Sequence, residues 1–228
     1  MTVTEVTLEG LAASAWLGRQ PVALRDALVG RGRRTALEPG QWLHGEGDEA
    51  TGVFVVLSGV VRVLTTVEDG RTVLLDLLGP GAALGQSISF GGGPRLVSAI
   101  AATPVAVLRI SDIGLQAAAR VEPEVWRAVS ELVYGQLAHV VRLAGEALSL
   151  GPRARLAARL VALSRTFAAH DDGWIPVSQA DLAELTALSR KSVNQHLGAW
   201  RSAGLLELRY GAIRLRAPER LSQGRIGD

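Results

Sequence analysis

Glycines divide the chain between about residues 35 and 110 into short apolar runs, and their spacing limits the possible fold more than any other feature. Gly59, Gly70 and Gly81 lie eleven residues apart, which is the length of one strand plus one turn in small barrels and sandwiches. Glycine supplies the positive φ that tight hairpins need. The intervening runs are rich in β-branched residues, as strands are; they span 53–57, 60–64, 72–78 and 105–110. An antiparallel β-barrel is therefore expected here.

Helical patterns replace the strands after residue 110. Ser111-Asp112 predicts the start of a short helix, and Glu122-Pro123-Glu124 that of a longer one, because proline and acidic residues favour the first turn. Gly151-Pro152 ends the long helix, since proline lacks an N–H donor and restricts its neighbour. The sequence thus predicts an α+β chain with a barrel domain over 1–121, a long helix over 122–150 and a C-terminal domain over 151–228.

The long helix carries an apolar stripe in steps of three and four. Such a stripe spans more than three heptads, and it favours a homodimer through a parallel helix pair over ordinary core packing. Its expected interface residues are Trp126, Val129, Val133, Gln136, Val140, Leu143, Ala147 and Leu150. A polar residue at a stripe position can fix the register of a helix pair, and Gln136 is expected to do so.

Two short helices in succession follow in the C-terminal domain. Ser178 with Asp181 forms a variant of the capping box that begins a helix, and Ser189 begins a second helix over 190–200. The apolar residues that pack the two helices together are Leu182, Leu185, Leu188, Val193 and Leu197. This spacing is typical of a helix-turn-helix, whose second helix enters the major groove of DNA by its N-terminal residues.

The polar residues of this region suit double-stranded DNA. Arginine pairs with guanine, asparagine and glutamine pair with adenine, and hydroxyls and lysine engage phosphates or base edges. Residues 204–209 and 212–216 flank Tyr210-Gly211, which predicts a hairpin, or wing, whose arginines straddle a DNA backbone. The candidate DNA-binding residues are Ser178, Gln179, Ser189, Arg190, Lys191, Ser192, Asn194, Gln195, Arg209 and Arg214.

Charge and composition agree with a DNA-binding second half. Residues 1–150 hold 12 arginines against 15 acidic residues, net −3, whereas residues 151–228 hold 12 basic residues against 7 acidic ones, net +5. A basic end is typical of a domain that meets a polyanion. The chain has no cysteine, which excludes disulfides and thiolate-bound metals. No catalytic triad, metal-ligand cluster or P-loop is recognisable, so no enzyme is expected. With no signal peptide or membrane span visible, a cytoplasmic location is expected.

Several segments together resemble the family of bacterial transcription regulators that contains the cyclic-AMP receptor protein and FNR, the Crp/Fnr family. They are Gly45-Glu46-Gly47-Asp48, residues 53–63, Gly70-Arg71, Gly79-Pro80-Gly81, Gly85, Pro94-Arg95, residues 177–190 and Ala203-Gly204-Leu205-Leu206. The resemblance implies an effector-sensing, cyclic-nucleotide-binding-type barrel (jelly roll), a dimerising helix and a winged helix-turn-helix. It also implies a homodimer on a palindromic operator and RNA polymerase as a partner.

The expected effector site departs from the cyclic-nucleotide pattern of this family. There, a Gly-Glu pair holds the ribose and an Arg-Ser pair holds the cyclic phosphate, and the matching residues here are Gly85-Gln86 and Arg95-Leu96. The polar pair that meets adenine in cyclic-AMP sensors falls on Val140 and Val141. Only Arg95 keeps its chemistry, so an effector other than cyclic AMP is expected. A structural ion pair is the alternative role for Arg95.

Other effectors and other functions stay open from the sequence. The missing cysteines exclude an iron–sulfur cluster, and a single histidine on the long helix, His139, gives little support for haem. No cofactor is required by the sequence; a cyclic nucleotide, a cyclic dinucleotide, a small acid or no ligand at all remain as alternatives. A ligand-binding or regulatory barrel without DNA function is the alternative of a different class. In the reading helix, Lys191 and Gln195 stand where the cyclic-AMP receptor pattern has Glu and Arg, so a different DNA half-site is expected.

Overall fold

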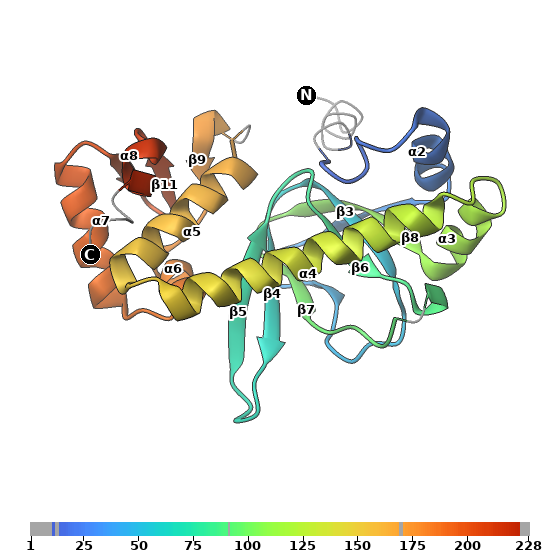
Figure 1. The fold of residues 1–228 in the computed structure, drawn as a ribbon, viewed down its shortest axis with the longest axis horizontal. Coiled ribbons are helices and arrows are strands. Elements are labelled where there is room, and N and C mark those ends of the chain that lie inside the picture. The colour runs from blue at the N-terminus through green and yellow to red at the C-terminus, as the bar shows by residue number, and fades with distance from the viewer. Residues whose placement is uncertain (1–10, 12–13, 91, 169–170, 224–228) are drawn as a thin grey trace. The chain divides into compact units, whose positions relative to one another are not determined.

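The computed structural model describes residues 11, 14–90, 92–168 and 171–223, which form two compact units (Figure 1). The first unit runs to residue 139, and the second begins at residue 140 and includes residues 73–75. The division falls within helix α4, Val125–Ser149, a helix of 25 residues.

Two four-stranded sheets form the β-roll of the first unit, in the orders β1-β8-β3-β6 and β2-β7-β4-β5. The four expected runs are all strands: β3 Gly52–Ser58, β4 Val61–Thr66, β5 Thr72–Leu78 and β8 Val105–Ser111. Four shorter strands complete the sheets: β1 Arg33–Leu37, β2 Trp42–His44, β6 Ala83–Gln86 and β7 Ser98–Ala101. The predicted antiparallel β architecture is confirmed.

Strand β3 is buried on both of its faces. Phe54 and Val56 point into the roll, where they pack against the small residues Ala99 and Ala101 of the opposite sheet. Val53, Val55 and Leu57 point to the other side, into a second core that they share with helices. Because successive strand residues face opposite sides, a strand covered on both sides needs an unbroken apolar run, and residues 53–57 provide one.

Helices cover the outer face of the first sheet. They are α2 Val22–Val29, α3 Asp112–Ala119 and the first turns of α4. Ser111 begins α3 as expected, because its side chain accepts a hydrogen bond from the Gly114 N–H. The Trp16 indole N–H donates to the Ala128 carbonyl over 2.7 Å, which fastens the segment before α2 to α4.

Helix α4 begins at Val125, three residues later than the sequence suggests. Residues 122–124 form the turn before it, in which the Glu122 carbonyl accepts from the Val125 N–H. The helix ends at Ser149, and Gly151 precedes α5, Pro152–Thr166, whose first residue is proline. The predicted helix break at Gly151-Pro152 is thus confirmed.

The second unit is a winged helix-turn-helix, as predicted. After α5 come the short η2 Asp171–Gly173, β9 Trp174–Ile175, α6 Gln179–Thr186, α7 Arg190–Ser202, β10 Leu206–Arg209, β11 Ala212–Leu215 and α8 Pro218–Gln223. Strands β10 and β11 form the expected hairpin, and β9 pairs with β11 as a third strand. Of the helices that the structure describes, none combines the length and apolar character that a membrane crossing requires.

Replacing Gly59 by alanine will destabilise the protein more than the same change at Gly70. Both glycines have positive φ, 82° and 80°, which costs an alanine about 1–2 kcal/mol. A Cβ at Gly59 would also lie 2.2 Å from the Pro104 carbonyl oxygen, whereas at Gly70 it meets nothing within 4 Å. We expect urea unfolding to show a further loss of roughly 1–3 kcal/mol in Gly59→Ala. Equal losses in the two variants would contradict the close contact with Pro104.

Candidate functional site

Side-chain hydrogen bonds hold both ends of α6, the first helix of the helix-turn-helix. The Ser178 hydroxyl accepts from the Asp181 N–H over 3.0 Å, and an Asp181 carboxylate oxygen accepts from the Ser178 N–H over 3.2 Å. At the other end, the Arg155 Nε–H of α5 donates to the Thr186 carbonyl over 2.8 Å. The predicted capping box is therefore present, and Arg155, which the sequence did not single out, positions the turn.

A tight turn orients α7 against α6. Ala187 adopts the left-handed conformation with φ 51°, and the Ser189 hydroxyl then begins α7 by accepting from the Ser192 N–H over 3.0 Å. The side chains of Leu182, Val193 and Leu197 are fully buried, as the spacing predicted. Leu185 and Leu188 are half-buried.

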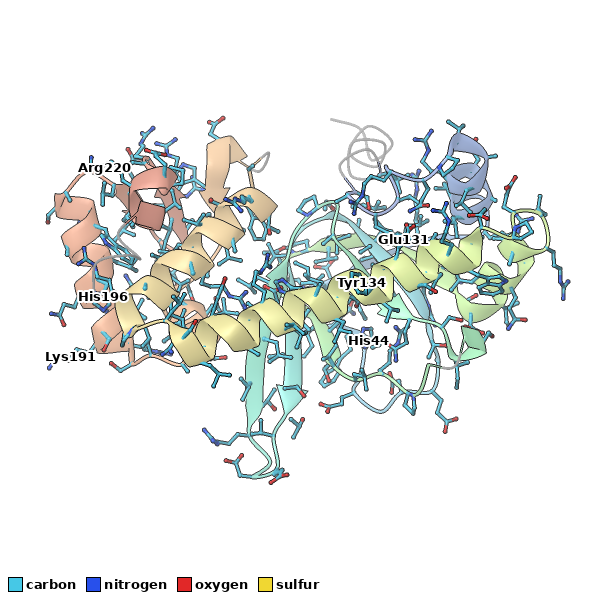
Figure 2. All side chains as sticks on the ribbon, in the orientation of Figure 1. His44, Glu131, Tyr134, Lys191, His196 and Arg220 are labelled. Carbon is cyan, nitrogen blue, oxygen red and sulfur yellow. The ribbon has the colours of Figure 1, made fainter. Side chains whose placement is uncertain are left out.

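The first turns of α7 present polar side chains to solvent. Arg190, Lys191, Asn194 and Gln195 are exposed, and so is Gln179 at the start of α6. Lys191 projects from the N-terminal end of α7 (Figure 2). Ser192 is half-buried, and Ser178 and Ser189 use their hydroxyls to cap helices. The structure thus brings four of the predicted residues, Arg190, Lys191, Asn194 and Gln195, together on α7, with their guanidinium, ammonium and amide groups exposed.

Two arginines of the wing, Arg214 and Arg216, bond to Glu207 of the same hairpin. The Arg214 guanidinium donates to Glu207 over 2.9 Å through Nε, and Arg216 Nε donates to the other oxygen of Glu207 over 2.7 Å. These bonds, first from Arg214 and then from Arg216, hold the pKa of Glu207 below its usual value. Arg209 and Arg214 also lie over the Trp174 ring, at 4.3 and 4.8 Å from its centroid. Glu207 therefore neutralises part of the charge that the sequence assigned to the wing.

Three of the predicted effector residues meet at one end of the β-roll. Gly85 has φ +128°, and a Cβ there would lie 2.2 Å from the Gly52 carbonyl oxygen and 3.1 Å from Arg95 Nη1. The buried Arg95 donates from Nη1 to that same carbonyl over 2.9 Å. Glycine at 85 therefore makes room for the guanidinium. The Gln86 amide donates to the carbonyls of Gly93 and Pro94, over 3.1 and 2.7 Å.

Arg95 ion-pairs with no carboxylate within 4 Å among the described residues. Its guanidinium carbon lies 5.4 Å from the centroid of the Phe54 ring, and its Nε has no hydrogen-bond partner among the residues that the structure describes. Burial, and then the charge of Arg109, lower the pKa of Arg95 to about 10, against an opposing effect of Asp48. The alternative role as a structural ion pair therefore finds no partner here.

His44 lies beside the same Phe54 ring, although the sequence did not assign it to the effector site. Its ring lies 5.7 Å from that of Phe54, centroid to centroid, and 7% of the residue is exposed. Burial, and then the charge of Arg95, lower the pKa of His44 to about 4. The imidazole is thus neutral at pH 7. The other histidine of interest, His139, is bonded to Asp76 over 2.7 Å.

The predicted stripe on α4 does not remain on one face. Val129 is buried in the core of the first unit, and Trp126 packs against that core. Gln136 donates to the Gly85 carbonyl over 2.8 Å and accepts from the Gly85 N–H over 3.3 Å, so it bonds within its own chain. Leu143 and Leu150 are half-buried, while Val133, Val140 and Ala147 are exposed.

A second, overlapping stripe on α4 is apolar and exposed. Its members follow one another at helical spacing, with 42–90% of each residue exposed: Val133, Tyr134, Leu137, Val140, Val141 and Leu148. Val140 and Val141 therefore belong to an uncovered apolar surface of the helix. Helices in soluble proteins rarely leave such a stripe uncovered.

Comparison with known proteins identifies both halves of the chain. The cyclic nucleotide-binding domain family matches residues 34–120, and the Crp-like helix-turn-helix domain family matches residues 154–223. The "CRP-like cAMP-activated global transcriptional regulator" of Mycobacterium tuberculosis is 24% identical, over 92% of this chain and 96% of the relative. The "Nitrogen fixation regulation protein FixK" of Bradyrhizobium diazoefficiens is 27% identical, over 83% of this chain and 81% of the relative.

Solved structures show the same fold. FixK2 from Bradyrhizobium japonicum superposes with a TM-score of 0.75 at 22% identity, covering 84% of this chain and 96% of that one. The c-di-GMP responsive global regulator CLP of Xanthomonas campestris superposes with a TM-score of 0.66 at 23% identity, covering 86% of this chain and 99% of that one.

The buried His44 will make the protein less stable in mild acid. The unfolded chain takes up a proton below pH 6.5, whereas folded His44 does so only near pH 4, so stability is lost as the pH falls between these values. This amounts to about 2 kcal/mol between pH 7 and pH 5. We expect urea unfolding of His44→Gln to show a correspondingly smaller fall. An unchanged fall in His44→Gln would contradict the buried, neutral state.

Proposed function

The chain belongs to the Crp/Fnr family of transcription regulators, and on this premise we propose that it is a homodimer that reads a palindromic operator under the control of an effector other than cyclic AMP. The family consists of regulators rather than enzymes, and its helix-turn-helix binds DNA. The observation that carries the proposal is the exposed polar first turn of α7, on a helix fixed by Ser189 and packed through Val193 and Leu197.

The reading mechanism follows from the side chains of α7. Arg190 offers two parallel N–H donors that match the O6 and N7 atoms of guanine, and the Asn194 and Gln195 amides match the N6 and N7 atoms of adenine. Lys191 places a positive charge near the phosphates. A two-fold dimer presents two such helices, so the operator has two half-sites about one helical turn apart.

The exposed α4 stripe supports the dimer. Two copies packed through Val133, Leu137 and Val140 would cover apolar area that one chain leaves in water, which is the driving force for helix pairing. Gln136 lies outside this pairing surface and instead links α4 to Gly85. A ligand beside Gly85 and Arg95 therefore acts on a residue that is bonded directly to the dimer helix, and this gives a route by which the effector biases the dimer.

The groups around Arg95 argue against cyclic AMP. Leu96 is 77% exposed and has no hydroxyl to offer a cyclic phosphate. Gln86 is neutral and its amide nitrogen is already bonded to its own loop. Val140 and Val141 provide no hydrogen bond to adenine. The Mycobacterium tuberculosis relative is named as cAMP-activated, so cyclic AMP stays the comparison ligand in any binding test. RNA polymerase is the proposed partner once the dimer is on DNA.

Substitutions in α7 will test the reading helix. An operator is first selected from random duplexes with the full chain, and mobility shifts are then measured for Arg190→Ala and Gln195→Ala. We expect each variant to lose roughly tenfold to a hundredfold in affinity, because a good base contact contributes about 1–3 kcal/mol. Arg165→Ala removes an exposed charge from α5 and is expected to bind as the wild type does. Wild-type affinity in both α7 variants, or no duplex selected with the wild type, would refute the proposal.

A charge in the exposed stripe of α4 will separate the dimer. Leu137→Asp places a carboxylate where two apolar faces meet, so sedimentation is expected to show a monomer and a weakened operator complex. Gly135→Asp adds the same charge to a neighbouring position, where an added Cβ meets nothing within 4 Å, and it is expected to remain a dimer. A dimer of wild-type strength in Leu137→Asp would place the interface elsewhere.

A further inference from the structure

The inner face of the β-roll carries a row of arginines that the proposed function does not yet use. Arg33 of β1 is paired across the sheet with Arg109 of β8, and Arg109 is paired with Phe54 of β3. Residues paired in this way point to the same face. Phe54 faces the interior of the roll, so Arg33 and Arg109 lie on that face too. Both arginines are exposed.

Arg95 approaches this row from a different segment of the chain. The guanidinium carbons of Arg95 and Arg109 lie 5.4 and 5.8 Å from the centroid of the same Phe54 ring. Arg109 is close enough to lower the pKa of Arg95. Two like charges therefore share one aromatic neighbour, and one of the two belongs to a buried residue.

Little negative charge opposes these arginines. Among the residues that the structure describes, the Arg33 and Arg109 guanidiniums have no hydrogen-bond or ion-pair partner, and Arg109 has only the Phe54 ring beside it. Asp48 is the carboxylate whose charge raises the pKa of Arg95, but it forms no ion pair with Arg95 within 4 Å; one of its oxygens accepts from the Gly45 N–H over 2.7 Å. Gln86 adds no charge. Two buried nitrogens near the Phe54 ring, Arg95 Nε and His44 Nδ1, also have no partner within the described chain.

We infer that the effector carries a terminal phosphate dianion, held jointly by Arg95 and Arg109, with Arg33 next in the row. This deepens the proposed function and rests on it, since it names the chemistry of the ligand that the first unit senses. Arg109 is the added determinant: a second guanidinium gives the site two positive charges for one phosphate.

Charge matching favours a monoester over a cyclic diester at such a site. A phosphomonoester carries close to two negative charges at pH 7.5, because its second pKa is about 6, and it has three terminal oxygens to accept from two guanidinium forks. A cyclic phosphodiester carries one charge and has two free oxygens. It would leave one of the two arginines without a counter-charge beside a buried cation, which is unfavourable.

Calorimetry with a matched pair of ligands tests this inference. Adenosine 5′-monophosphate and 3′,5′-cyclic AMP differ in the opened phosphate ring, and inorganic phosphate shows what the dianion alone contributes. With the full wild-type chain at pH 7.5 we expect the monophosphate to bind at least tenfold more tightly than the cyclic nucleotide. Arg109→Ala is expected to remove that preference and Arg109→Lys to keep part of it. Arg34→Ala, which removes a charge on the opposite face of β1, is expected to leave it unchanged.

The smallest probes keep the test independent of the organic part of the effector. The arginine Nε–H resonances are followed while methyl phosphate or dimethyl phosphate is added, and we expect only methyl phosphate to shift the signals of Arg95 and Arg109. The inference is overturned if dimethyl phosphate shifts them equally, if neither probe shifts them, or if Arg109→Ala keeps the wild-type preference. The operator mobility shift is measured on the same protein. If the ligand result overturns the inference but DNA binding is intact, the effector class is wrong while the proposed DNA-binding function is unaffected.

Discussion

The double-sided burial of β3 is the constraint on which the first unit depends. Its alternate side chains belong to two different cores, one inside the roll and one under the helices. A shift of the strand by one residue would exchange Phe54 for Val53 or Val55 and place every side chain in the wrong core. The register is therefore strongly fixed, and so are the positions of β6 and β8, which pair with β3 on either side.

The candidate effector site inherits this rigidity. Arg95 is bonded to the Gly52 carbonyl at the start of β3, and Phe54 two residues later is the common neighbour of two guanidiniums and of His44. Arg95 itself lies in the loop before β7, so its bond to the backbone of a buried strand ties that loop to the most rigid element of the roll. The second unit is organised in a comparable way, since its reading helix is oriented by caps and by three fully buried apolar side chains.

Local signals made much of this fold predictable. Caps at Ser111, Ser178 and Ser189, and the break at Gly151-Pro152, are short-range features of the sequence, and the structure contains all of them. The arginine row was not predictable, because Arg33 and Arg109 are 76 positions apart and meet only through strand register. The same holds for Glu207, whose bonds to Arg214 and Arg216 depend on the hairpin. On α4, the sequence predicted the helix itself. Which of its apolar residues stay exposed was not predictable, because that depends on which ones the β-roll covers, such as Val129.

The exposed position of Lys191 has a practical consequence for studying this protein. It is the only lysine in the chain, and it stands in the first turn of the reading helix. A reagent that acylates primary amines therefore meets a single side-chain target, and that target is at the surface proposed to face DNA. A fluorophore attached there would report occupancy of the reading helix directly, and protection from acylation would footprint the complex from the protein side.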